Sequence, residues 1–130
     1  MIVDSSAIVA IIRNELEATR FYNAIMASPR AVLAAPTYVE CCLVLTKDRS
    51  EEAVKELDSL LDKISIEIIA FTPKMAQIAA KAFLKYGKGR GNPAQLNFGD
   101  CISYAVSKVE AMPLLFKGDD FVHTDVERVL

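Results

Sequence analysis

Acidic residues follow two apolar segments of the chain at the points where those segments end. Asp4 comes directly after Ile2-Val3, and Asp119 and Asp120 follow the segment Leu114 to Phe116 after a short turn. If both segments are strands of a parallel sheet, their carboxyl ends meet at one edge, where α/β proteins place their binding sites. Each acid also has a simpler interpretation, because Asp4 can cap the next helix and Asp119 can belong to a turn.

Two further acids lie within predicted helices. Glu40 belongs to a segment, residues 39–45, that is apolar around most of its circumference, and a buried carboxylate must be paired, protonated or bound to a cation. Lys47 is nearly two turns away, and a salt bridge to a more distant Lys or Arg is the structural alternative. Asp100 occupies a first helical turn, where its charge complements the helix dipole. The face that follows Asp100 is apolar, which predicts that this helix start packs against the sheet.

Asp4, Glu40, Asp100 and Asp119 therefore come from four separate elements and could converge at one sheet edge. Carboxylates brought together without cations repel one another strongly. Oxygen ligands of this kind suit Mg²⁺ or Mn²⁺. Acidic clusters that hold such ions cleave phosphodiesters, because the metal activates water and stabilises the leaving oxygen.

The elements that must position these acids alternate along the chain. Predicted strands cover residues 2–3, 31–34, 66–71 and 114–116. Predicted helices cover residues 5–13, 18–26, 36–47, 53–64, 72–86 and 98–110, with a polar break at 48–51 and a glycine-rich loop at 87–91. Strands separated by helices favour an α/β fold, a three-layer α/β/α sandwich with a central, mostly parallel sheet of about four to five short strands. We expect residues 1–130 to form a single domain.

Composition narrows the function classes. The chain has 130 residues, 52% of them hydrophobic, and a net charge of -2, which excludes a disordered chain and disfavours a strongly basic nucleic-acid binder. Without the four candidate acids, 13 of the 17 acidic residues remain against 15 basic ones, a balance of +2. No apolar run is long enough to cross a membrane. Cys41, Cys42 and Cys101 are expected to be core residues of a reduced, cytoplasmic protein.

Four segments of the sequence resemble PIN domains, and more narrowly the VapC toxins of bacterial toxin–antitoxin pairs. They stand in the order and near the spacing of that family, and they are Ile2-Val3-Asp4-Ser5-Ser6-Ala7, Pro36-Thr37-Tyr38-Val39-Glu40, Asn97-Phe98-Gly99-Asp100-Cys101 and Leu114 to Phe121. The resemblance spans almost the whole chain and implies a PIN-like fold.

The resemblance also implies an activity and partners. It implies an Mg²⁺- or Mn²⁺-dependent endoribonuclease that acts as a toxin, binds a VapB-type antitoxin and forms a homodimer. The catalytic and metal-binding acids of the family fall on Asp4, Glu40 and Asp100, and the fourth is placed on Asp119, with the adjacent Asp120 as the alternative. A catalytically inactive PIN-like module that binds RNA or a protein is the competing hypothesis.

Residues outside the acidic set are candidates for substrate or partner binding. Lys85, Lys88 and Arg90 lie before and within the glycine-rich loop, where they could bind RNA phosphates or simply form a solvated helix end. Thr124 is included because Thr124-Asp125 matches a pattern common near the end of such toxins. The apolar faces of the helices at residues 37–47 and 51–63 could form a dimer interface or an antitoxin groove, and packing in the core is the alternative.

Overall fold

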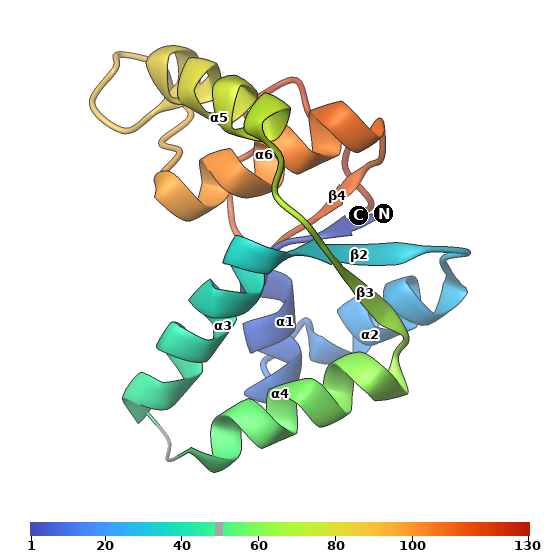
Figure 1. The fold of residues 1–130 in the computed structure, drawn as a ribbon. Coiled ribbons are helices and arrows are strands. Elements are labelled where there is room, and N and C mark those ends of the chain that lie inside the picture. The colour runs from blue at the N-terminus through green and yellow to red at the C-terminus, as the bar shows by residue number, and fades with distance from the viewer. Residues whose placement is uncertain (49–50) are drawn as a thin grey trace.

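A parallel sheet forms the centre of the protein (Figure 1). The computed structural model describes residues 1–48 and 51–130. Its strands are β1 (Ile2–Val3), β2 (Ala31–Ala34), β3 (Ile66–Ile69) and β4 (Leu114–Leu115), in the order β3-β2-β1-β4. Ile2 pairs with Val32 on one side and with Leu114 on the other, all in parallel register. The predicted α/β class and parallel sheet are confirmed, and β3 and β4 end earlier than predicted.

Helices cover both faces of this sheet. They are α1 (Ser5–Ile12), α2 (Ala18–Ala27), α3 (Ala35–Asp48), α4 (Glu52–Lys63), α5 (Pro73–Tyr86) and α6 (Phe98–Glu110). The first four lie on one side and α5 and α6 on the other (Figure 1). The predicted break at 48–51 includes residues 49 and 50, which lie outside the described residues. Among the described residues, no helix combines the length and the apolar character needed to cross a membrane.

Each short strand contributes to two cores because successive side chains point to opposite faces. The core on the side of α1–α4 contains Val3, Leu33 and Leu115, and the core under α5 and α6 contains Ile2, Val32 and Leu114. These strand residues are all at most 1% exposed. Strands β1, β2 and β4 are apolar and buried at every position, as parallel strands covered on both faces usually are, whereas the edge strand β3 carries the exposed Glu67.

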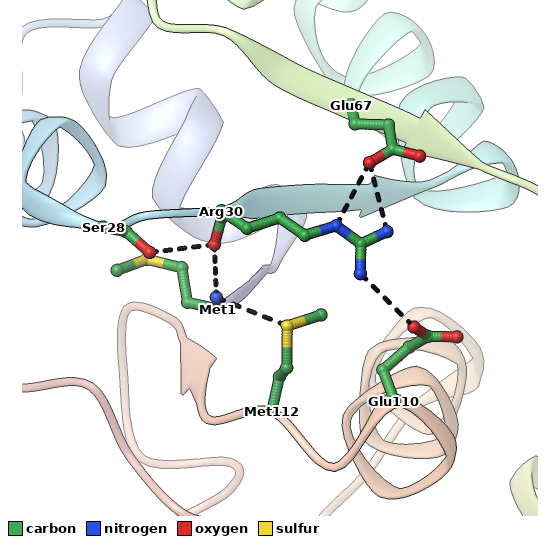
Figure 2. Close-up of polar contacts among 6 residues, drawn as sticks. All are labelled: Met1, Ser28, Arg30, Glu67, Glu110 and Met112. Atoms are coloured by element: carbon green, nitrogen blue, oxygen red, sulfur yellow. Dashed lines mark hydrogen bonds and ion pairs between the residues drawn. The ribbon is translucent and has the colours of Figure 1, made fainter.

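The amino ends of the strands are held together by Arg30 (Figure 2). Its guanidinium group donates two hydrogen bonds of 3.2 and 3.1 Å to Glu67 of β3, and it lies 3.7 Å from Glu110 at the end of α6. The backbone carbonyl of Arg30 accepts a 2.6 Å hydrogen bond from the Met1 amino group, whose pKa is lowered by partial burial and by the charge of Arg30. These contacts lie at the opposite end of the sheet from Asp4.

Helix α6 ends on a residue in a strained conformation. Ala111 adopts φ 51° and ψ 44°, in the left-handed region, and its N–H donates to the carbonyl of Ser107. The side chain is exposed. Only glycine adopts this conformation without a steric penalty.

Ala111→Gly should therefore stabilise the protein by about 0.5–1 kcal/mol, because relief of the steric penalty exceeds the extra entropy of the unfolded chain. Urea unfolding checks this. Ala80→Gly, an exposed position inside α5, is the control and should destabilise by about 1 kcal/mol. A loss of stability in Ala111→Gly would contradict the left-handed backbone conformation of Ala111.

Candidate active site

Asp4 is a buried carboxylate at the carboxyl end of β1. It caps α1, because its Oδ2 accepts hydrogen bonds from the backbone N–H of Ser6 at 2.9 Å and from the Ser6 hydroxyl at 2.6 Å. Its Oδ1 accepts a 2.6 Å hydrogen bond from the hydroxyl of Ser103 in α6. The residue is 3% exposed. The capping role considered from the sequence is therefore real, and it coexists with burial at the sheet edge.

The carboxylate of Glu40 reaches the same edge from α3. A Cβ atom built on Gly99 would clash with both carboxylate oxygens of Glu40, so a side chain at position 99 would displace this carboxylate. Burial, and then the charge of Asp4, raise the pKa of Glu40, while a hydrogen bond from Ser5 acts in the opposite direction. Within residues 1–48 and 51–130, nothing donates a hydrogen bond to the buried Oε2 of Glu40. The alternative considered from the sequence, a salt bridge to a distant Lys or Arg, is thus not formed at that oxygen.

Asp100 lies in the first turn of α6 and takes part in a reciprocal cap with Asn97. Asn97 N–H donates to Asp100 Oδ2 at 2.8 Å, and Asp100 N–H donates to the Asn97 side chain at 2.9 Å. Burial, together with the negative charges of Asp4, Asp120 and Glu40, raises the pKa of Asp100 to about 7, against the effect of the Asn97 hydrogen bond.

The structure separates the two adjacent acids that follow β4. The charge of Asp120 acts on Asp100 together with the charges of Asp4 and Glu40. Asp119 instead lines a different hollow, of about 220 Å³, which Glu17 of the segment before α2 also lines. Gly118 adopts φ 94°, a conformation that favours glycine, where the chain turns after β4. The influence of its charge on Asp100 supports Asp120, the alternative to Asp119 in the sequence prediction, and the choice between the two stays a prediction.

The cluster has the composition of a site for a hard divalent cation. Asp4, Glu40, Asp100 and Asp120 supply carboxylate oxygens, one of which is buried without a hydrogen-bond donor. Burial and like charges raise the pKa values of Glu40 and Asp100, and a bound cation would lower them. In the described part of the chain, no three His, Cys, Asp or Glu side chains are placed so that they could hold a metal ion together. The donor set fits the ion, while the coordination geometry is not preformed.

Comparison with known proteins places the sequence in a family. The sequence matches the PIN domain over residues 1–127. It is 45% identical over 126 residues to ribonuclease VapC42 of Mycobacterium tuberculosis, covering 97% of this chain and 96% of that protein. The chain belongs to the PIN-domain family of VapC ribonucleases.

Solved structures agree with this assignment at the level of the fold. The Mycobacterium tuberculosis toxin VapC20, described as cleaving the sarcin-ricin loop, superposes with a TM-score of 0.78 at 14% identity, over 96% of this chain and 95% of that chain. A toxin–antitoxin complex from Klebsiella pneumoniae gives a TM-score of 0.73 at 16% identity, over 95% and 92% of the two chains. The predicted PIN-like fold is confirmed.

The remaining predicted residues of this PIN domain lie outside the acidic cluster. Lys85 is exposed, and its amino group lies 4.7 Å from the centre of the Tyr86 ring. Lys88 and Arg90 are exposed in the glycine-rich loop. Thr124 donates a 2.8 Å hydrogen bond to the carbonyl of Phe121, so its hydroxyl supports a turn. A role for these four residues in substrate binding stays a prediction.

Two apolar hollows border the acidic cluster. Their volumes are about 530 and 500 Å³, and both are lined by Pro36, Phe98 and Ile102. The second also contains Glu40 and the exposed side chain of Leu43. Phe98, which directly precedes Gly99 and Asp100, is 83% exposed. In contrast, the apolar residues Ala53, Leu57 and Leu61 of α4 are buried in the core, which confirms the core alternative for that helix.

The raised pKa of Asp100 predicts how stability depends on pH. The unfolded chain loses this proton near pH 4, whereas the folded protein retains it up to about pH 7, so the folded state binds more protons between these values. The free energy of unfolding of the PIN domain in EDTA should therefore fall as the pH rises from about 4 to about 7. Glu40, whose pKa is also raised, acts in the same direction.

Asp100→Asn should reduce this pH dependence and should be more stable than the unmodified protein at pH 8 in EDTA. Urea unfolding at several pH values measures both effects. Asp62→Asn, an exposed acid of α4, is the control and should keep the original pH dependence. Identical pH profiles for Asp100→Asn and the unmodified protein would show that Asp100 does not carry the effect.

Proposed function

We propose that this protein is a metal-dependent endoribonuclease and the toxin of a toxin–antitoxin pair. The observation that carries the proposal is the convergence of acids from four elements at the carboxyl edge of the sheet, with a buried Glu40 oxygen that lacks a hydrogen-bond donor. The VapC ribonucleases to which the chain is similar support RNA as the substrate. The acid set is intact, which favours an enzyme over an inactive binding module.

In this proposal Asp4 and Asp100 are the principal ligands of Mg²⁺ or Mn²⁺, and Glu40 and Asp120 complete the site directly or through water. The bound cation would supply activated water and stabilise the leaving oxygen. Asp4 would hold the ion with a carboxylate of fixed orientation, because both of its oxygens accept hydrogen bonds. The buried Cys41 is excluded as a nucleophile, because burial and the nearby acids raise the pKa of its thiol.

The clearest test of the enzyme is Asp100→Asn. This change keeps an oxygen that can accept the Asn97 hydrogen bond and removes the charge. Cleavage of RNA should fall by more than the ~10–100-fold that loss of an outer-shell partner costs. Asp4→Asn is less suitable, because an amide nitrogen would replace one of the two oxygens that accept hydrogen bonds from Ser6 and Ser103, so the change alters these contacts as well as the charge.

The assay compares single-stranded and structured RNAs with Mg²⁺, with Mn²⁺ and with EDTA. Asp62→Asn controls for substitution of a surface acid. If the unmodified protein cleaves RNA in a metal-dependent way and Asp100→Asn retains this cleavage, the proposed site is excluded. No cleavage of any RNA by the unmodified protein would favour the inactive binding module.

The fourth acid is tested by a pair of neighbouring variants. Because the charge of Asp120 reaches Asp100 and Asp119 lines another hollow, Asp120→Asn should lower cleavage more strongly than Asp119→Asn. Both residues are exposed, so neither change should unfold the protein. Measurement of cleavage at several Mn²⁺ concentrations distinguishes a loss of metal affinity from a general loss of activity. A greater loss in Asp119→Asn would restore the assignment made from the sequence.

We propose a VapB-type antitoxin as the protein partner. The apolar hollows shared by Pro36, Phe98 and Ile102 suit an apolar segment of such a partner. Because the second hollow contains Glu40, a basic residue on that segment would be electrostatically favoured. The solved toxin–antitoxin complex with the same fold supports a protein partner. The homodimer stays a prediction of the family resemblance.

A further inference from the structure

Asp4 is held by two kinds of hydrogen bond. The two from Ser6 are local, since a residue that caps a helix normally accepts from the residues just after it. The third comes from Ser103, which is 99 positions away in the sequence and only 1% exposed. Helix capping does not require this third bond, and it joins β1 to the helix that carries Asp100.

The position of Ser103 on α6 gives the bond a specific consequence. Ser103 lies three residues after Asp100, so both side chains project from the same face of the helix, one turn apart. The hydroxyl donates at 2.6 Å to Oδ1, and Oδ2 is occupied by the two Ser6 donors. The Asp4 carboxylate therefore cannot rotate without breaking a buried hydrogen bond. Its orientation is tied to the helix that places Asp100.

We propose that Ser103 is a positioning residue, whose hydroxyl holds the Asp4 carboxylate in the orientation in which it shares a divalent cation with Asp100. The inference rests on the proposed metal-dependent function. A carboxylate oxygen has two lone pairs, so Oδ1 keeps one for the cation while the other accepts from Ser103. Hydrogen bonds from outside the coordination shell orient metal ligands in this way, and their loss typically weakens metal binding by about 10–100-fold.

Ser107 offers a matched control in the same helix. It lies one turn after Ser103, is 4% exposed, and its hydroxyl donates a 2.7 Å hydrogen bond to the carbonyl of Met112. Ser103→Ala and Ser107→Ala thus each remove one buried hydroxyl and one hydrogen bond from α6. They differ in whether the acceptor belongs to the acidic cluster.

The experiment measures Mn²⁺ affinity by electron paramagnetic resonance of the free ion, and thermal unfolding in EDTA. Ser103→Ala should bind Mn²⁺ about 10-fold more weakly, and its RNA cleavage should recover as Mn²⁺ is raised. Ser107→Ala should lose thermal stability and keep its Mn²⁺ affinity. A purely structural role of Ser103 would instead lower thermal stability in both variants and leave Mn²⁺ affinity unchanged in both.

A second pair guards against misfolding of the alanine variant. Ser103→Thr and Ser103→Val have nearly the same shape, and only threonine retains the hydroxyl. Ser103→Thr should bind Mn²⁺ more tightly than Ser103→Val, and equal affinities of the two variants would overturn the role of Ser103. If the unmodified protein binds no Mn²⁺, the proposed function fails and this inference fails with it. Unchanged affinity in Ser103→Ala beside weakened affinity in Asp100→Asn overturns the role of Ser103 alone.

Discussion

The burial of like charges at the carboxyl edge of the parallel sheet is the constraint on which the site depends. Parallel strands bring Asp4 to an edge that both helical layers cover, and α3 and α6 bring Glu40 and Asp100 to the same place. Burial and mutual repulsion raise the pKa values of Glu40 and Asp100. An arrangement that costs free energy without a counter-charge is characteristic of a functional site, because core packing alone does not require it.

The two hydrophobic cores hold the elements that carry these acids. The core on one side of the sheet fixes α1, whose first turn Asp4 caps, and α3, which carries Glu40. On the other side, α6 is buried along most of its length, so Asp100 and Ser103 are fixed by packing as well as by their hydrogen bonds. At the carboxyl edge, Lys117 N–H donates to the Ser6 hydroxyl, which itself donates to Asp4. The segment after β4, which carries Asp120, is therefore linked to Asp4 through the Ser6 hydroxyl.

The sequence predicted most of the fold, and physical reasons led from it to three of the four acids of the proposed site. Strand ends and helix periodicity place Asp4 and Asp100, and an acid within an apolar helix identifies Glu40. The choice between Asp119 and Asp120 depends on how the chain turns at Gly118, which a local sequence pattern does not determine. The sequence does not reveal a role for Gly99 or Ser103, because a small residue in an apolar helix is equally consistent with core packing. The only indication in the sequence is their spacing from Asp100, one residue before it and three residues after it.

The overall charge of the chain is connected to this local electrostatics. The net charge of -2 includes the clustered acids, and without them the remaining residues carry a small positive excess. An empty cluster repels the phosphates of RNA, whereas a bound divalent cation neutralises part of the cluster and attracts them. Under the proposed function, the same ion relieves the repulsion among the acids and permits the substrate to approach. In this proposal, one set of carboxylates governs metal binding, stability near neutral pH and access of RNA, and the orientation of Asp4 within that set depends on its uncharged neighbours Ser6 and Ser103.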